Sequence, residues 1–103
     1  MKFNPVLFTK AISDETRQKI MNICCCTSLS VNEIVEKLDV SQPTVSHHLA
    51  ILREANLVTV REEGKQTFYS LNQENIAICC GQLMIKFAPK TVTTEKLIKT
   101  LNA

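Results

Sequence analysis

Five cysteines in two groups carry the most distinctive chemistry of this 103-residue sequence. Soft thiolates select ions such as As(III), Cd, Hg, Cu(I) or Zn, and thiols of low pKa form sulfenate, persulfide or disulfide species. Neighbouring cysteines make a poor disulfide, because the bridge needs Cα atoms at least about 4.4 Å apart and neighbours lie about 3.8 Å apart. We therefore expect any bridge to join one group to the other. The candidate sensor residues are Cys24, Cys25, Cys26, Cys79 and Cys80.

Plain burial is the alternative for these thiols, because free cysteine packs like a small hydrophobe. Cys24 and Cys80 fall on apolar stripes of expected helices, which suits packing. Three consecutive helical residues spread over about 200° of arc, so the first group cannot face one ion unless the helix frays at Cys26. No structural disulfide framework is expected. The sequence begins without the apolar stretch of a secretory signal, so we expect a cytoplasmic protein in a reducing compartment.

Residues 41–49 form a second segment with recognisable chemistry, because short polar side chains gather at the expected start of a helix. A helix that reads DNA needs such residues near its N-terminus, where its backbone approaches the major groove closely. Glutamine forms paired hydrogen bonds with adenine, Ser and Thr bond bases or phosphates, and a helix start suits a phosphate. An ordinary solvated helix face is the alternative. The candidate DNA-binding residues are Ser41, Gln42, Thr44, Ser46 and His47.

The two histidines of this segment are adjacent in the sequence. Adjacent helical residues point about 100° apart, so these two cannot easily share a metal ion. We expect His47 to face outward, toward DNA or a phosphate. We expect His48 to pack at the edge of the buried face with a satisfied ring nitrogen.

Basic residues also surround the expected tip of a β-hairpin. Arg61 and Lys65 are candidates for contact with phosphates or with the minor groove, which suits a flexible basic tip. Glu62 and Glu63 weaken this signal, as does a net charge of only +2. An ordinary polar turn is the alternative.

Hydrophobic periodicity indicates the elements that position these residues. Helical spacing and capping residues predict helices at about 6–12, 14–26, 31–38, 41–55 and 73–87, and a short one at about 93–101. A period of two predicts two strands joined as a hairpin, at 57–61 and 66–71. This order is that of a winged helix-turn-helix.

We therefore predict a mainly α fold with a β-hairpin, as one domain over residues 1–103. Its helix-turn-helix covers about 31–55, its wing about 57–71 and its C-terminal dimerisation helix about 73–87. A composition of 45% hydrophobic and 21% charged residues is that of a folded globular protein. No apolar run approaches the roughly 18 residues of a membrane-spanning helix, and no motif indicates an enzyme. So small a domain buries only about two thirds of its unfolded surface, which favours a homodimer.

Three stretches resemble the ArsR/SmtB family of bacterial metal- and thiol-responsive repressors: residues 10–17 (KAISDETR), 38–49 (LDVSQPTVSHHL) and 52–58 (LREANLV). The similarity covers about residues 6–88. It implies a homodimeric winged helix with an interface on the first and last helices and an inducer that lowers operator affinity. Asn56 replaces the usual Gly at one helix end, and Asn also tolerates the left-handed conformation. The interface residues expected from this resemblance are Val6, Leu7, Ile76, Cys80, Leu83 and Phe87.

The resemblance also implies where inducers bind, and two of the family's sites are missing here. A C-x-C pair of some members falls on Ser30 and Asn32. The Asp and His ligands of other members fall on Gln73, Asn75, Lys86 and Pro89. A zinc sensor of either type is therefore disfavoured. The five cysteines remain as the candidate residues that bind the inducer.

The sequence thus predicts a homodimeric repressor of double-stranded operator DNA, released by a thiophilic ion such as As(III) bound through cysteines. It predicts no required cofactor, no membrane partner and no catalytic residues. One alternative is a redox- or persulfide-responsive repressor that joins the two cysteine groups. Another is a constitutive winged-helix regulator or protein-interaction module with structural cysteines.

Overall fold

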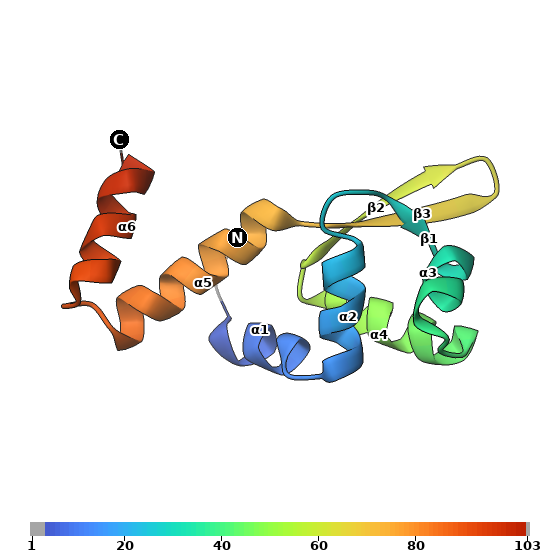
Figure 1. Cartoon of the computed structure of the whole chain (residues 1–103), viewed down its shortest axis with the longest axis horizontal. Coiled ribbons are helices and arrows are strands. Elements are labelled where there is room, and N and C mark those ends of the chain that lie inside the picture. The colour runs from blue at the N-terminus through green and yellow to red at the C-terminus, as the bar shows by residue number, and fades with distance from the viewer. Residues whose placement is uncertain (1–3, 103) are drawn as a thin grey trace.

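The computed structural model describes residues 4–102, and the side chains of residues 4–100. Figure 1 shows a body of helices and a small sheet, from which a long helix leads to a last helix that turns back. The elements, in chain order, are α1 (Pro5–Ile12), α2 (Glu15–Ile23), β1 (Leu29–Ser30), α3 (Val31–Leu38), α4 (Gln42–Glu54), β2 (Val58–Glu63), β3 (Gln66–Leu71), α5 (Gln73–Phe87) and α6 (Val92–Asn102).

Local capping residues determine where α3 and α4 begin and end. Ser30 and Glu33 form a reciprocal capping box at the start of α3, and Asp39 caps its C-terminal end with φ 53°. Ser41 caps α4, with Pro43 tolerated in the first turn. Asn56 follows α4 with φ 59°, which confirms the left-handed conformation expected there.

The wing is an antiparallel hairpin in which Val58 lies opposite Leu71 and Glu63 opposite Gln66. Its strands are joined by Gly64 and Lys65, and Gly64 has φ +61°, a conformation that glycine adopts without strain. β1 adds a third strand beside β3. The sequence did not predict β1, because two residues are too short to show a period.

The hydrophobic core lies between the helices of the body and the sheet. The large aliphatic side chains buried most completely come from α2, α3, α4 and the residue before β2: Ile20, Ile34, Val45, Leu49, Leu52 and Leu57. α1 contacts both α2 and α5, so it joins the long helix to the body. Within residues 4–102, no helix is both long enough and apolar enough to cross a membrane.

Two elements end at residues clearly different from those expected. The helix predicted over 14–26 ends at Ile23, and Cys24 is its C-cap. The first wing strand begins at Val58 and continues to Glu63, beyond the predicted 57–61. The last predicted helix, at about 93–101, is confirmed as α6.

Candidate functional site

Helix α4 is buried on one side and exposed on the other. Val45, Leu49 and Leu52 point into the core. Thr44 is half-buried, and its hydroxyl accepts a hydrogen bond from Ser41 at 2.8 Å. The remaining polar candidates of this helix lie exposed on its outer face: Ser41, Gln42, Ser46 and His47.

His48 joins α4 to the α1–α2 corner. Its Nδ1 lies 2.9 Å from Nη1 of Arg17, whose side chain also donates to the carbonyl oxygens of Lys10 and Ala11 at 3.1 and 2.6 Å. Arginine only donates, so Nδ1 accepts, and the ring proton lies on Nε2, 3.9 Å from Asp14 Oδ1. Burial lowers the pKa of His48. The prediction of a packed histidine with a satisfied nitrogen is confirmed, and the contact fixes the orientation of α4.

The two basic candidates of the wing differ in their surroundings. Arg61 is paired with Glu63 and lies over the ring of Phe68, 4.9 Å from its centroid. Lys65, at the tip, is exposed. A phosphate therefore competes with Glu63 for the Arg61 guanidinium.

A cavity of about 220 Å³ lies between the start of α3, the start of α4 and the wing tip. Gln42 and Lys65, both expected from the sequence to contact DNA, meet here. Among the residues that the structure describes, no acidic side chain lines the cavity, so amide, hydroxyl and ammonium donors can converge on an anion. Asn32 and Thr67 were missed by sequence reasoning, because their only signal was polarity. The lining residues are Ser30, Val31, Asn32, Gln42, Lys65, Gln66 and Thr67.

Two of the five cysteines are core residues. Cys24 has no exposed surface, and burial raises its pKa to about 11. Cys79 is also buried, which raises its pKa, and the neighbouring thiol of Cys80 raises it further. Cys80, expected on the packed stripe of its helix, is instead exposed on this chain. Burial favours the neutral thiol, so Cys24 and Cys79 behave as small hydrophobic residues. This is the alternative to sensing that the sequence left open.

Cys25 and Cys26 lie beyond the end of α2, with their Sγ atoms 3.1 Å apart. Cys25 is half-buried and Cys26 exposed. A hydrogen bond with Cys26 raises the pKa of Cys25. Among the residues that the structure describes, no group of three or more His, Cys, Asp or Glu side chains is placed to hold a metal ion.

The first cysteine group contacts the start of α5, and the second group is part of α5 farther along. Cys24 O accepts from Leu71 N at 2.9 Å, and Cys25 O accepts from Gln73 Nε2 at the start of α5. Cys79 lies six residues beyond Gln73, about 9 Å farther along the helix axis. The fold therefore brings the first group to the beginning of α5, and the second group follows more than one turn later.

Apolar side chains remain exposed on the helices predicted to form a dimer interface. Val6 of α1 is 60% exposed and Phe87 of α5 is 73% exposed. Leu7, Ile76 and Leu83 are half-buried within the single chain. Further large apolar side chains are exposed along α5 and α6: Ile78, Ile85, Val92 and Leu97.

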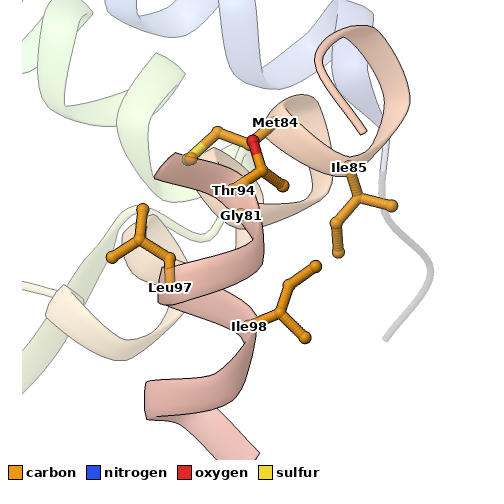
Figure 2. Close-up of a pocket in the computed structure, with 6 residues that line it drawn as sticks. All are labelled: Gly81, Met84, Ile85, Thr94, Leu97 and Ile98. Atoms are coloured by element: carbon orange, nitrogen blue, oxygen red, sulfur yellow. The ribbon is translucent and has the colours of Figure 1, made fainter. Parts of the chain in front are cut away.

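A small apolar cavity lies where α6 folds back on α5, as Figure 2 shows. Its volume is about 30 Å³, far below that of a small-molecule site. Thr94 fixes this corner, since its hydroxyl donates to Ala88 O at 2.7 Å and accepts from Thr91 at 2.8 Å. The cavity is a packing defect at a helix junction, lined by Gly81, Met84, Ile85, Thr94, Leu97 and Ile98.

The helix-turn-helix, the wing and the exposed polar face of α4 define a winged helix-turn-helix DNA-binding protein. Residues 14–60 match the family described as "Bacterial regulatory protein, arsR family". Together with the similarities below, this match shows that the chain belongs to the ArsR family of bacterial DNA-binding transcriptional regulators. The resemblance read from the sequence is confirmed.

Relatives and solved structures agree with this assignment. Transcriptional repressor SdpR of Bacillus subtilis (strain 168) is 40% identical over 63 residues, 61% of this chain and 70% of that protein. An arsenical resistance operon repressor of Staphylococcus xylosus is 38% identical, over 63% of this chain and 62% of that protein. The structure of reduced HlyU from Vibrio cholerae N16961 has 34% identity and a TM-score of 0.64, over 81% of this chain and 86% of that chain.

Proposed function

We propose that the protein is a homodimeric repressor that acts in the cytoplasm and leaves its operator when a thiophilic ion binds its cysteines. Its helix-turn-helix, over about 31–55, its wing, over about 57–71, and its dimerisation helix, over about 73–87, work as one domain. It requires no cofactor to bind DNA and catalyses no reaction. Its inducer is As(III) or another soft ion, such as Cd, Hg, Cu(I) or Zn.

DNA is bound by the exposed face of α4 and by the wing. The observation that carries this proposal is the exposed polar row on α4, over a buried apolar side that fixes its direction. Gln42 and His47 contact bases in the major groove. Lys65 and Arg61 contact phosphates or the minor groove, while Ser41, Thr44 and Ser46 position the helix start on the backbone.

The cavity between α4 and the wing, whose described lining residues carry no carboxylate, supports a further contact with DNA. The phosphate backbone that separates the two grooves passes between a recognition helix and its wing. Lys65 supplies the charge in this cavity, and the side-chain amide of Asn32 supplies a donor. Asn32 thereby joins the DNA-binding residues.

A second copy of the chain covers the apolar side chains of α1 and α5. Exposed Val6 and Phe87 support this arrangement, because neither is covered within the single chain. The interface residues we propose are those expected from the sequence: Val6, Leu7, Ile76, Cys80, Leu83 and Phe87. A dimer places two recognition helices on two half-sites one helical turn apart.

A soft ion fits the thiols better than an oxidant does. A redox-sensing cysteine needs a thiolate at neutral pH. The pKa values of Cys24, Cys25 and Cys79 are raised instead. An ion also has to displace these thiol protons, and its bonds to sulfur offset that cost. The relatives named as arsenical resistance operon repressors support As(III) as the first ion to test.

The test is fluorescence anisotropy on a duplex selected from a random library, titrated with As(III), Cd, Zn, Cu(I) and a persulfide donor. We expect a soft ion to release the protein, and a chelator to restore binding with all thiols recovered. Release by the persulfide donor alone, reversed only by a reductant, would favour the redox alternative. Release by none of them would leave a constitutive regulator.

A further inference from the structure

The chain that leaves α4 is held by the start of α5. Asn56, with φ 59°, turns the chain out of α4, and its carbonyl oxygen accepts from Nδ2 of Asn72 at 3.2 Å and Nδ2 of Asn75 at 2.8 Å. The backbone N–H of Asn72 donates to Leu57 O at 2.9 Å. These hydrogen bonds fasten two successive peptide groups to α5, and we call the four residues Asn56, Leu57, Asn72 and Asn75 the bracket.

The two asparagine side chains of α5 and its cap are directed at one carbonyl oxygen. Asn75 is only 4% exposed, and its Oδ1 has no hydrogen-bond partner in the described part of the chain. A buried amide with an unpaired oxygen costs free energy, so packing alone would favour an apolar side chain here. Oδ1 of Asn72 caps α5 by accepting from Asn75 N at 3.1 Å, which orients its Nδ2. Both side chains therefore act as donors to Asn56.

A second contact holds α4 at its middle. Arg17 contacts His48 and donates to the carbonyl oxygens of Lys10 and Ala11 in α1. The helices α1 and α5 carry the side chains of the proposed dimer interface, so each of them is connected to α4 by hydrogen bonds. Asn56 lies eight residues beyond His48, about 12 Å farther along the helix direction. The direction of α4 relative to the proposed interface is thus fixed at two points.

We propose that Asn72 and Asn75 are positioning residues that set the separation of the two DNA half-sites that the dimer accepts. This inference rests on the proposed homodimer and adds the residues that determine its preference for half-site spacing. Because two points define the direction of a helix, loss of the bracket lets α4 tilt about His48.

The size of such a tilt matches the spacing of base pairs. Gln42 lies about 9 Å from His48 along α4, so a tilt of about 10° moves it by about 1.6 Å. Both copies of α4 tilt in a dimer, and their separation then changes by up to about 3 Å, close to the rise of roughly 3.4 Å per base pair. A dimer without the bracket therefore tolerates half-sites that are displaced by one base pair.

The experiment compares three duplexes. One is the duplex selected from the random library, and the other two have one base pair inserted or removed between its half-sites. Fluorescence anisotropy gives the affinity for each, and the spacing penalty is the factor by which altered spacing lowers affinity. A general loss of DNA binding leaves this factor unchanged. Analytical ultracentrifugation and circular dichroism melting check that each variant is dimeric and folded.

Near-isosteric substitutions remove the hydrogen-bond donors. Asn75→Asp keeps the shape of the side chain but places a carboxylate oxygen against Asn56 O. Asn75→Leu removes the donor without adding charge. Asn72→Asp keeps the oxygen that caps α5, and a negative charge at a helix start is favourable, so this variant folds even if the buried substitutions do not. Asn22→Asp, at an exposed residue of α2 outside the bracket, is the matched control for charge.

For the parent protein and Asn22→Asp we expect a spacing penalty of at least about tenfold, since two fixed helices cannot engage both displaced half-sites. In Asn72→Asp, Asn75→Asp and Asn75→Leu the penalty should fall below about threefold, because α4 then samples several directions. Affinity for the original spacing should fall about three- to tenfold in these variants, because the loosened helix has to be ordered on binding.

Three results would overturn the inference. If folded, dimeric bracket variants lost affinity but kept the parent's spacing penalty, Asn72 and Asn75 would serve stability alone. If Asn22→Asp reduced the penalty equally, added charge rather than the bracket would account for the effect. If the parent bound all three duplexes equally well, the proposed binding of a dimer to two half-sites would itself fail.

Discussion

The DNA-binding half and the thiol-bearing half of this molecule are held by different kinds of polar contact. At the starts of α3 and α4, hydrogen bonds span three residues, from Ser30 to Glu33 and from Ser41 to Thr44. Around the start of α5 they span 48 residues from Cys25 to Gln73 and 19 from Asn56 to Asn75. Local bonds fix the starts of both helices, and the long-range contact described above within α4 itself is the one between Arg17 and His48. Long-range bonds change when one segment moves. The second half is therefore suited to regulation.

The largest effect is expected at the proposed dimer interface, because it decides whether the chain binds its operator as a monomer or as a dimer. Phe87→Glu places a charge on a side chain that is 73% exposed, so the monomer should stay folded. We expect about 2–4 kcal/mol of lost dimer stability and nearly complete loss of operator binding. Analytical ultracentrifugation measures the assembly. Leu83→Glu is the harsher comparison, because Leu83 also packs against the core. A folded Phe87→Glu dimer would place the interface elsewhere.

The next largest effect is expected from removing the side chains of α4 that contact bases. Gln42→Ala and His47→Ala should each weaken specific binding by about 1–3 kcal/mol while leaving non-specific DNA binding unchanged. Competition anisotropy against mixed-sequence DNA separates the two quantities. Ser46→Ala is a smaller change on the same face. Unchanged specificity in both main variants would move the reading surface off α4.

Phosphate binding in the cavity between α4 and the wing should respond to salt. Lys65→Ala is expected to weaken all DNA binding and to reduce the slope of log affinity against log salt by about 0.9. Asn32→Asp adds a negative charge to the same cavity and should weaken binding as well. Lys37→Ala and Asn22→Asp are matched controls for the two variants, since both residues are exposed and neither lines the cavity. If test and control variants changed DNA affinity equally, the overall charge of the protein rather than this cavity would account for the effect.

The smallest effect concerns the long-range contact that holds α4. Burial lowers the pKa of His48 from 6.5, Asp14 opposes the shift, and Arg17 and His47 add to it. The unfolded chain then binds the proton more readily, so the contribution is complete above pH 6.5 and is lost as the pH falls below it. Urea denaturation between pH 8 and pH 5 should show this decline. His48→Gln should flatten the decline, and exposed His47→Gln should keep it. An equal slope in both variants would exclude His48 as its source.

The sequence by itself determined the helix-turn-helix, the wing and the exposed face of α4. These features depend on neighbours in the chain: a capping residue three positions from its partner, a helical or two-residue period, and Gly64 or Asn56 at a positive φ. Such signals are complete within a few residues. The resemblance added the family, because the same stretch of residues carries it.

Tertiary structure alone decided what the cysteines can do. The sequence placed Cys80 on the packed stripe of its helix, but contacts with the body bury Cys79 instead. It also extended α2 to residue 26, although the chain leaves the helix after Ile23 to pair β1 with β3. The cavity beside Lys65 and the bond between Cys25 and Gln73 likewise join segments far apart in the chain. Burial and long-range hydrogen bonds depend on every element that packs at a site, and no local pattern of residues records them.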